Sequence, residues 1–292
     1  MSVSLALIKL GNKIFPPIVH PFNLQKDGVK TYAEWQYEKG ADTVAFFAER
    51  YPAEVMFRGK RVLDMGCGAG GKSLYYASMG AREVVGVDIV EHYEAEANAL
   101  AKKLGLQDRF RFYCGSADAL PFPDGSFDTI IMNDFMEHIS TPEEALREAV
   151  RLLSPDGRIY INFPPYGHPF GAHMTDLINM PWVQFFFSED ALCRAYRELS
   201  KSVPDGEERV AFRMSQDEKG KYHITYINKM TLRRFGKILQ NLNVTPEYYA
   251  EIPLRNFLRP LARFPLTKEK FVRMGVCVIG GSNITAKQKN EK

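Results

Sequence analysis

The chain has 292 residues, 45% of them hydrophobic and 25% charged, a composition typical of a globular protein with a substantial core. Its 38 basic and 35 acidic residues leave a net charge of +3, which does not indicate nucleic acid as a partner. The scattered cysteines form no C-x-x-C pair, and no apolar run approaches the ~20 residues of a transmembrane helix. We therefore expect a cytoplasmic protein with reduced thiols and no transmembrane segment.

The N-terminal part, residues 1–57, is expected to form a helical cover over the remainder of the chain. Residues 32–51 are predicted to form a helix, with aromatic side chains such as Trp35 and Phe47 available for packing. Most of these aromatics are expected to belong to a hydrophobic core.

Residues 58–163 alternate between short apolar strands and helical stretches. Strands are expected at 62–63, 83–88, 110–114, 129–133 and 158–163, and helices at 71–79, 91–104 and 141–153. The last helix has Pro142 at its first position, and Thr141 with Glu144 matches a capping box. Alternating β and α units of this length predict an α/β, doubly wound, mostly parallel sheet with right-handed crossovers.

This alternation ends after Phe163, where a Pro-rich segment begins. Residues 164–229 contain a His-rich and aromatic segment, a helix at 188–200 and a charged stretch. Because ligands bind beyond the carboxyl ends of strands in open α/β sheets, we expect this insertion to cap an acceptor site; a structural excursion is the alternative. Residues 230–284 then return to the core with a helix at 231–242 and strands near 248–252 and 274–280, and residues 285–292 form a solvated tail.

The most informative segment is Arg61-Val62-Leu63-Asp64-Met65-Gly66-Cys67-Gly68-Ala69-Gly70-Gly71. Its G-x-G-x-x-G spacing, at Gly66, Gly68 and Gly71, is also the fingerprint of dinucleotide sites, so an NAD(P)-dependent oxidoreductase is an alternative. Asp64, however, would repel a pyrophosphate group placed against this loop. A carboxylate here suits a ligand with a positive charge nearby, such as an α-ammonium group.

The segment 62–70 resembles the first motif of class I S-adenosylmethionine-dependent methyltransferases of the small-molecule, methyltransferase-11-like kind. The resemblance covers residues 58–163 and includes the segments 115–122 and 124–131 in the expected order. It implies a Rossmann-like, seven-stranded, mostly parallel sheet and S-adenosylmethionine as the cofactor. It also places Asp64 near the methionine moiety, Asp88 at the ribose hydroxyls and Asp118 at the adenine amine. The predicted cofactor-binding residues are Asp64, Gly66, Cys67, Gly68, Asp88, Ile89, Asp118, Ala119 and Asn133.

The fourth strand ends in Asn133-Asp134-Phe135-Met136-Glu137-His138-Ile139, a region that borders both cofactor and acceptor in the family. One interpretation is that Glu137 and His138 brace the turn. A second makes His138 a general base, which suits the near-neutral titration of imidazole. A third is a metal site, because Asp134, Glu137 and His138 have the D/E-x-x-E-H pattern of some metal-dependent members. We expect no metal and keep these three residues as candidates.

The insertion adds His173 as a second candidate for the catalytic base or a ligand. The predicted activity is transfer of a methyl group to an O, N or C atom of a small-molecule acceptor by in-line displacement. A non-catalytic S-adenosylmethionine-binding protein is a further alternative. A basic and aromatic stretch from Arg255 to Arg273 is expected to be a solvated face, with an anionic acceptor or a membrane surface as its alternative partner.

Overall fold

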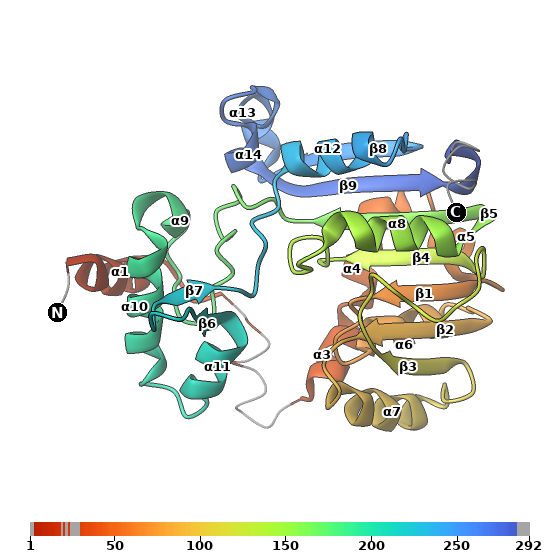
Figure 1. Ribbon diagram of the computed structural model, residues 1–292, viewed down its shortest axis with the longest axis horizontal. Coiled ribbons are helices and arrows are strands. Elements are labelled where there is room, and N and C mark those ends of the chain that lie inside the picture. Colours follow the sequence, from red (N-terminus) through yellow and green to blue (C-terminus); the bar gives the residue numbers. More distant parts are fainter. Residues whose placement is uncertain (1–2, 19, 21–22, 24–29, 285–292) are drawn as a thin grey trace.

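The computed structural model describes residues 3–18, 20, 23 and 30–284. Its centre is a seven-stranded sheet with the strand order β3-β2-β1-β4-β5-β9-β8 (Figure 1). The pairs among the first five strands are parallel, whereas β9 is antiparallel to both β5 and β8. The predicted doubly wound, mostly parallel sheet is confirmed. The strands are β1 (Arg61–Met65), β2 (Glu83–Asp88), β3 (Phe110–Cys114), β4 (Phe127–Asn133), β5 (Leu153–Phe163), β8 (Tyr248–Pro253) and β9 (Val272–Gly280).

Helices cover both faces of the sheet (Figure 1). Successive residues of a strand point to opposite faces, so Ile130 packs in the core under one helical layer and Ile131 in the core under the other. The first layer contains α8 (Pro142–Leu152) and α12 (Leu232–Asn241). The second layer contains α3 (Tyr32–Glu38), α4 (Gly40–Ala48), α5 (Ala53–Phe57), α6 (Gly71–Ser78) and α7 (Tyr93–Leu104).

Two local predictions were wrong. The single helix expected over 32–51 is divided at Lys39, where α3 ends and α4 begins. Gly40 starts the second helix because it lies so close to the Tyr75 ring that a Cβ would clash. The capping box at Thr141 is also absent: its hydroxyl donates to Asp118 Oδ2 at 2.7 Å instead of capping α8.

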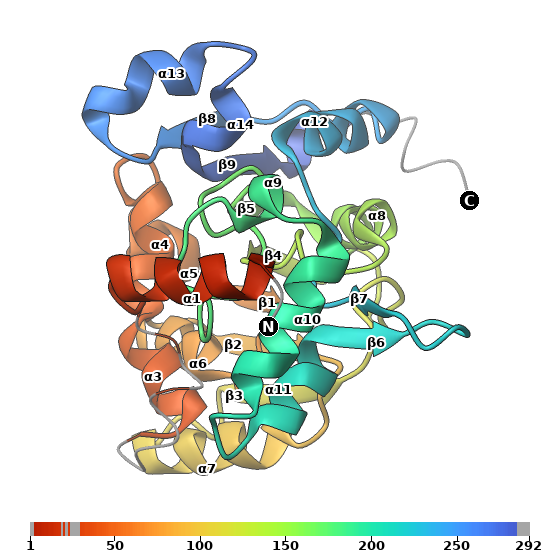
Figure 2. The same ribbon diagram turned by 90° about the vertical axis from the view of Figure 1, so that its left-hand side faces the viewer.

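The insertion builds a third hydrophobic core together with α1 (Val3–Ile14). Leu5 and Ile8 of α1 pack in this core, and Figures 1 and 2 both show α1 beside α10. The N-terminal 57 residues are therefore shared between two places: α1 joins the insertion, whereas α3, α4 and α5 cover the sheet. We call α1 and residues 164–229 the cap. Its other elements are α9 (Val183–Phe186), α10 (Glu189–Ser200), α11 (Gly206–Arg213), β6 (Met214–Gln216) and β7 (Tyr222–Ile224).

The connection between β8 and β9 forms a separate lobe at the edge of the sheet (Figure 1). It contains η1 (Asn256–Leu258), α13 (Arg259–Arg263) and α14 (Lys268–Phe271), and η2 (Gly281–Asn283) follows β9. The tail predicted at 285–292 lies outside the described residues. In the part of the chain that the structure describes, no helix is both long and apolar enough to span a bilayer.

The topology determines where a ligand can bind. The chain runs from β1 outward through β2 to β3 and then returns to β4 on the other side of β1. Ligands of open α/β sheets bind beyond the carboxyl ends of the strands at such a reversal. The carboxyl ends of β1, β4 and β5 point toward the cap (Figure 1).

Candidate active site

The glycine loop, residues 66–70, leaves β1 at this edge of the sheet. Gly66, Gly68 and Gly70 have φ angles of 78°, 56° and 75°, a left-handed conformation that disfavours side chains. A Cβ on Gly66 would also clash with the Phe135 ring. The loop therefore lies directly against the segment that follows β4.

Two side chains hold the glycine loop in place. Asp88, at the end of β2, accepts a hydrogen bond from the Gly68 N–H at 2.8 Å, and burial raises the pKa of its carboxyl. Gln36 of α3 accepts from the Gly71 N–H at 3.2 Å and donates to the Cys67 carbonyl at 3.3 Å. Sequence reasoning predicted Asp88 but missed Gln36, because a glutamine within an amphipathic helix carries no distinct signal.

Asp64 is only 3% exposed, and its Oδ2 accepts a hydrogen bond from the Ser73 hydroxyl at 2.6 Å. Burial raises the pKa of Asp64 to about 6, against the opposing effect of this hydrogen bond. The bond ties the first turns of α6 to β1. A direct contact between Asp64 and the ammonium group of a cofactor stays a prediction, and the structure adds Ser73 as the partner of this carboxyl.

The groups predicted to hold the adenosine lie on the loops after β2 and β3. Ile89 is 73% exposed, which leaves an apolar side chain next to Asp88 for contact with a ligand. Asp118 accepts hydrogen bonds from the hydroxyls of Ser116 and Thr141, and these bonds lower the pKa of its carboxyl. Cys67 is buried, Ala119 is exposed, and Asn133 is buried at the end of β4.

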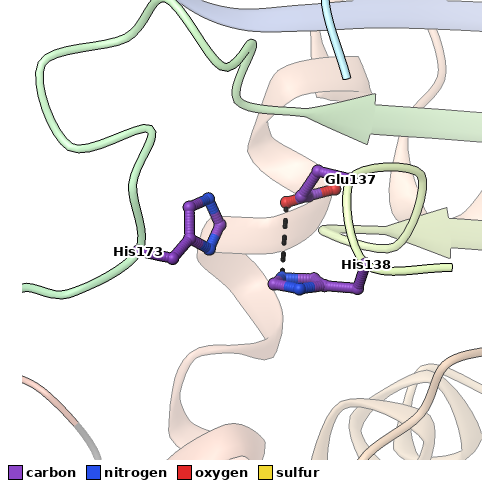
Figure 3. Close-up of side chains that lie close together, drawn as sticks. All are labelled: Glu137, His138 and His173. Carbon is purple, nitrogen blue, oxygen red and sulfur yellow. Dashed lines mark ion pairs between the residues drawn. The ribbon is translucent and has the colours of Figure 1, made fainter. Parts of the chain in front are cut away.

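The two predicted catalytic histidines lie together. Figure 3 shows Glu137 and His138, in the turn after β4, facing His173 from the loop after β5. One potential ligand atom from each of the three lies within 4.8 Å of the others. The His138 Nε2 is 3.7 Å from Glu137 Oε1, and the ring centroids of His138 and His173 are 4.9 Å apart. We call these three residues the acceptor cluster.

Glu137 is the least satisfied member of the acceptor cluster. Its side chain is 3% exposed, and neither carboxylate oxygen has a hydrogen-bond partner among the described residues. Burial, reinforced by the charge of Asp134, raises the pKa of Glu137 well above its usual range. A buried carboxylate without partners is costly, so this group is suited to a donor that arrives with a ligand.

The tautomer of His138 follows from its surroundings. Its Nδ1 is 3.0 Å from the Tyr226 carbonyl oxygen, which only accepts, so Nδ1 carries the proton and Nε2 presents a lone pair toward Glu137. Burial lowers the pKa of His138, and burial together with the neighbouring His138 lowers that of His173. Both imidazoles are therefore neutral at neutral pH.

Asp134 does not belong to the acceptor cluster. Its carboxylate is 3.4 Å from Lys72 Nζ and accepts a hydrogen bond from the Asn133 amide at 3.1 Å. The predicted metal candidates thus separate, and His173 lies where Asp134 was expected. One carboxylate and two imidazoles are a donor set for zinc or iron rather than for magnesium.

The cap supplies further positioning groups that the sequence did not indicate. Asn228 donates its side-chain amide to the carbonyls of Met136 and Ile139, the former at 2.7 Å, and its N–H donates to the Glu137 carbonyl at 2.8 Å. These bonds fix the turn that carries the acceptor cluster.

The turn at His173 is held by a buried ion-pair network. The guanidinium of Arg213 donates to the His173 carbonyl and lies 2.9 Å from Asp176. Arg209 is 3.4 Å from the same carboxylate, and all three side chains are buried. His173 has a φ of 51°, so this network holds a strained residue.

Comparison with known proteins identifies the core. The profile of a methyltransferase domain family matches residues 63–161. Residues 63–161 thus form a methyltransferase domain of the class I S-adenosylmethionine-dependent kind. The match contains the glycine loop, Asp88, Asp118 and two members of the acceptor cluster, but it ends before His173 and the cap.

Two relatives match about half of this chain or less. The uncharacterized methyltransferase YcgJ of Bacillus subtilis is 39% identical over 154 residues, which are 48% of this chain and 59% of YcgJ. The probable chloroplastic tocopherol O-methyltransferase of Oryza sativa subsp. japonica is 34% identical over 120 residues, 41% of this chain and 33% of that protein. The chain thus spans less than two thirds of the length of either relative.

Solved structures show the same fold. The PH0226 protein from Pyrococcus horikoshii superposes with a TM-score of 0.51 at 20% identity, covering 84% of this chain and 90% of that one. This likeness concerns the fold alone, and it is the family match at residues 63–161 that favours the methyltransferase prediction over the oxidoreductase alternative.

Proposed function

We propose that the protein transfers the methyl group of S-adenosylmethionine to an O or N atom of a small molecule held at the acceptor cluster. Transfer to carbon is the remaining form of the predicted activity. When bound, S-adenosylmethionine supplies an electrophilic methyl group on its sulfonium. The glycine loop, Asp88 and Asp118 would hold this donor, and the Phe135 contact with Gly66 joins the donor side to the turn that carries Glu137.

The buried, unpartnered carboxylate of Glu137 is the observation that carries this proposal. A hydroxyl or amine of the acceptor can donate a hydrogen bond to it, and the lone pair on His138 Nε2 lies beside it. Glu137 and His138 Nε2 both accept hydrogen bonds, so together they can orient a protonated hydroxyl or amine of the substrate. A purely hydrophobic acceptor would leave the carboxylate without a partner.

In the proposed reaction each bond that forms is matched by one that breaks. The acceptor heteroatom forms a bond to the methyl carbon, and the carbon–sulfur bond breaks with its electron pair passing to sulfur, which gives S-adenosylhomocysteine. The proton of the acceptor passes to the Glu137–His138 pair, and His173 orients the substrate. Most of the catalysis consists of alignment and exclusion of water, which the cap provides.

The test is a transfer assay with methyl-labelled cofactor and a panel of phenols, alcohols and amines. Glu137→Gln and His138→Ala should each lower kcat by about 10²- to 10⁴-fold, the usual contribution of a positioned proton acceptor. Calorimetry should show S-adenosylhomocysteine affinity within about twofold of the parent, since neither side chain belongs to the donor site. Glu94→Gln, which changes an exposed carboxylate of α7, should leave both quantities unchanged.

Two results would overturn the proposal. Full activity of Glu137→Gln would remove the acceptor cluster from the reaction. Binding of S-adenosylhomocysteine with no transfer to any acceptor of the panel would instead support a non-catalytic cofactor-binding protein.

The donor set of the acceptor cluster favours a second candidate, a divalent transition-metal ion held by Glu137, His138 and His173. The tautomer of His138 supports it, because the bond from Nδ1 to a backbone carbonyl is the usual way in which a protein orients a metal-binding imidazole. Such an ion would polarise an acceptor oxygen. Titration calorimetry with zinc, manganese and cobalt salts should show one site that His173→Ala removes; an unchanged heat in that variant would exclude it.

A further inference from the structure

The lobe between β8 and β9 exposes large apolar side chains that the proposed function does not use. Phe257 is 79% exposed and Leu266 is 83% exposed, and Leu261 and Phe264 are exposed beside them. These four come from one stretch that begins in η1, contains α13 and ends just before α14. We call these side chains the lobe face. An exposed apolar group of this size marks an interaction surface more often than a chance exposure.

The segment that carries the lobe face is also rich in basic side chains. The stretch from Arg255 to Arg273 holds six basic side chains and one acidic one, in a chain whose total charge is only +3. The acidic one, Glu269, is turned inward and accepts hydrogen bonds from the N–H groups at the start of α12. Lys268 is paired with Glu251 of β8, whereas among the described residues no carboxylate lies within ion-pair distance of Arg255, Arg259 or Arg263. These three charges are available to an external anionic partner.

A second segment extends the surface. Phe185 and Phe186 of α9 are exposed, and Lys270 of α14 lies over the Phe185 ring at 5.0 Å. Trp182 and Phe271 connect the two elements again, with ring centroids 6.0 Å apart. Figures 1 and 2 both place α9 next to α14. The cap therefore contacts the lobe at α14, where α9 adds two exposed phenylalanines beside a lysine.

We propose that this surface docks the protein onto an anionic lipid membrane. Arginine and lysine side chains around exposed Phe and Leu match the two layers of a bilayer surface, anionic headgroups and the acyl region below them. A symmetric dimer through the lobe face would place its cations against each other, which is repulsive. Nucleic acid would use the cations but not Leu261 and Leu266, which have no ring for stacking on bases.

The experiment is sedimentation of the full chain with large vesicles of phosphatidylcholine alone, or with about a quarter replaced by phosphatidylglycerol. The parent should bind the anionic vesicles at least about tenfold more strongly, and this preference should fall as salt shortens the screening length. Phe257→Ser/Leu266→Ser and Arg259→Gln/Arg263→Gln should each weaken binding by about tenfold or more. Val55→Ser/Arg109→Gln, which changes exposed residues outside the lobe, should bind like the parent.

Circular dichroism and S-adenosylhomocysteine affinity verify that every variant is folded. Equal binding to both kinds of vesicle, or undiminished binding by both lobe variants, would overturn the proposal. So would a parent that elutes as a dimer in size exclusion while Phe257→Ser/Leu266→Ser elutes as a monomer, because the partner would then be a second copy. Tighter binding to a single-stranded oligonucleotide than to anionic vesicles would also overturn it.

Discussion

The donor side and the acceptor side of the proposed active site are built in different ways. The donor side uses groups at the ends of β1, β2 and β3, the backbone itself forms the glycine loop, and Gln36 of α3 is the distant side chain that holds this loop. The acceptor cluster combines turns after β4 and β5 with Arg213 of α11 and Asn228 beyond β7. The donor side depends mainly on backbone conformation, whereas the acceptor side depends mainly on long-range side-chain bonds.

This difference predicts which property a substitution on each side should change. A change in the glycine loop should damage cofactor affinity and little else. A change in the cap network should damage acceptor turnover or stability, with the cofactor site intact. Four measurements test whether the two sides are independent, and they are given in order of decreasing expected effect.

The buried ion pairs of the cap should give the largest loss of stability. Asp176→Asn would remove the buried carboxylate that Arg213 and Arg209 share, although Arg209 keeps its pair with Asp205, and we expect the free energy of unfolding to fall by about 3 to 5 kcal/mol. Urea denaturation measures the change. Asp42→Asn, which breaks an exposed pair with Lys39, should cost less than about 1 kcal/mol. Equal effects of the two variants would show that the cap network is not a determinant of stability.

The glycine loop should give the largest loss of cofactor affinity. Gly66→Ala combines a left-handed φ with a clash against Phe135, a strain of about 3 kcal/mol that the free loop relieves by leaving its conformation. Because the ligand must restore that conformation on binding, the Kd for S-adenosylhomocysteine should rise roughly 100-fold. Gly59 also has a positive φ, of 71°, but lies in open space. Gly59→Ala should therefore cost about 1 kcal/mol of stability with no change in Kd. Weakened binding in both variants would implicate general destabilisation.

The buried acid of the donor side should make stability depend on pH. Burial raises the pKa of Asp64 to about 6, so the native state binds more protons than the unfolded chain, and this contribution to stability is lost as the pH rises from about 4 to 6. Asp64→Asn has no such loss. The stability of the variant relative to the parent should therefore rise by about 2 to 3 kcal/mol between pH 4 and pH 7. An identical difference at both pH values would mean that Asp64 keeps its ordinary pKa in the fold.

The smallest effect is expected at Asn228. Asn228→Ala removes the amide that fixes the turn of the acceptor cluster, and we expect kcat/KM to fall about tenfold, equivalent to about 1.4 kcal/mol. Cofactor affinity should not change. Asn241→Ala, which removes a surface hydrogen bond to Glu143, is the matched control. A loss of cofactor affinity in Asn228→Ala would show that the donor and acceptor sides are energetically coupled.

Much of the donor side could be predicted from the sequence because its determinants are local. Strand ends, positive-φ glycines and the carboxylate of Asp88 leave a contiguous pattern, and the predicted strands 83–88 and 110–114 match β2 and β3. The pairing of His173 with His138 was not predictable as geometry, because no periodicity relates two loops after different strands. The same holds for Arg213 and Asn228, whose roles depend on partners far away in the chain.

Two predictions from local sequence patterns were wrong because tertiary contacts determined the structure there. Thr141 fits a helix cap by type and spacing, yet its hydroxyl is turned toward Asp118. Gly40 divides a pattern that reads as one helix, because the close approach of Tyr75 is a tertiary requirement. Both exceptions arise where an element is adapted to a neighbour that is distant in sequence.

The two ends of the insertion meet: the Tyr166 N–H donates to the Met230 carbonyl at 2.6 Å. The residues between them therefore form a loop with closed ends. The entropy cost of closing such a loop grows only slowly with its length, so a longer insertion costs the core little stability. Such a cassette can be lengthened, shortened or exchanged during evolution without altering the strands that carry the donor site. One methyl-transferring core can in this way be combined with many acceptors.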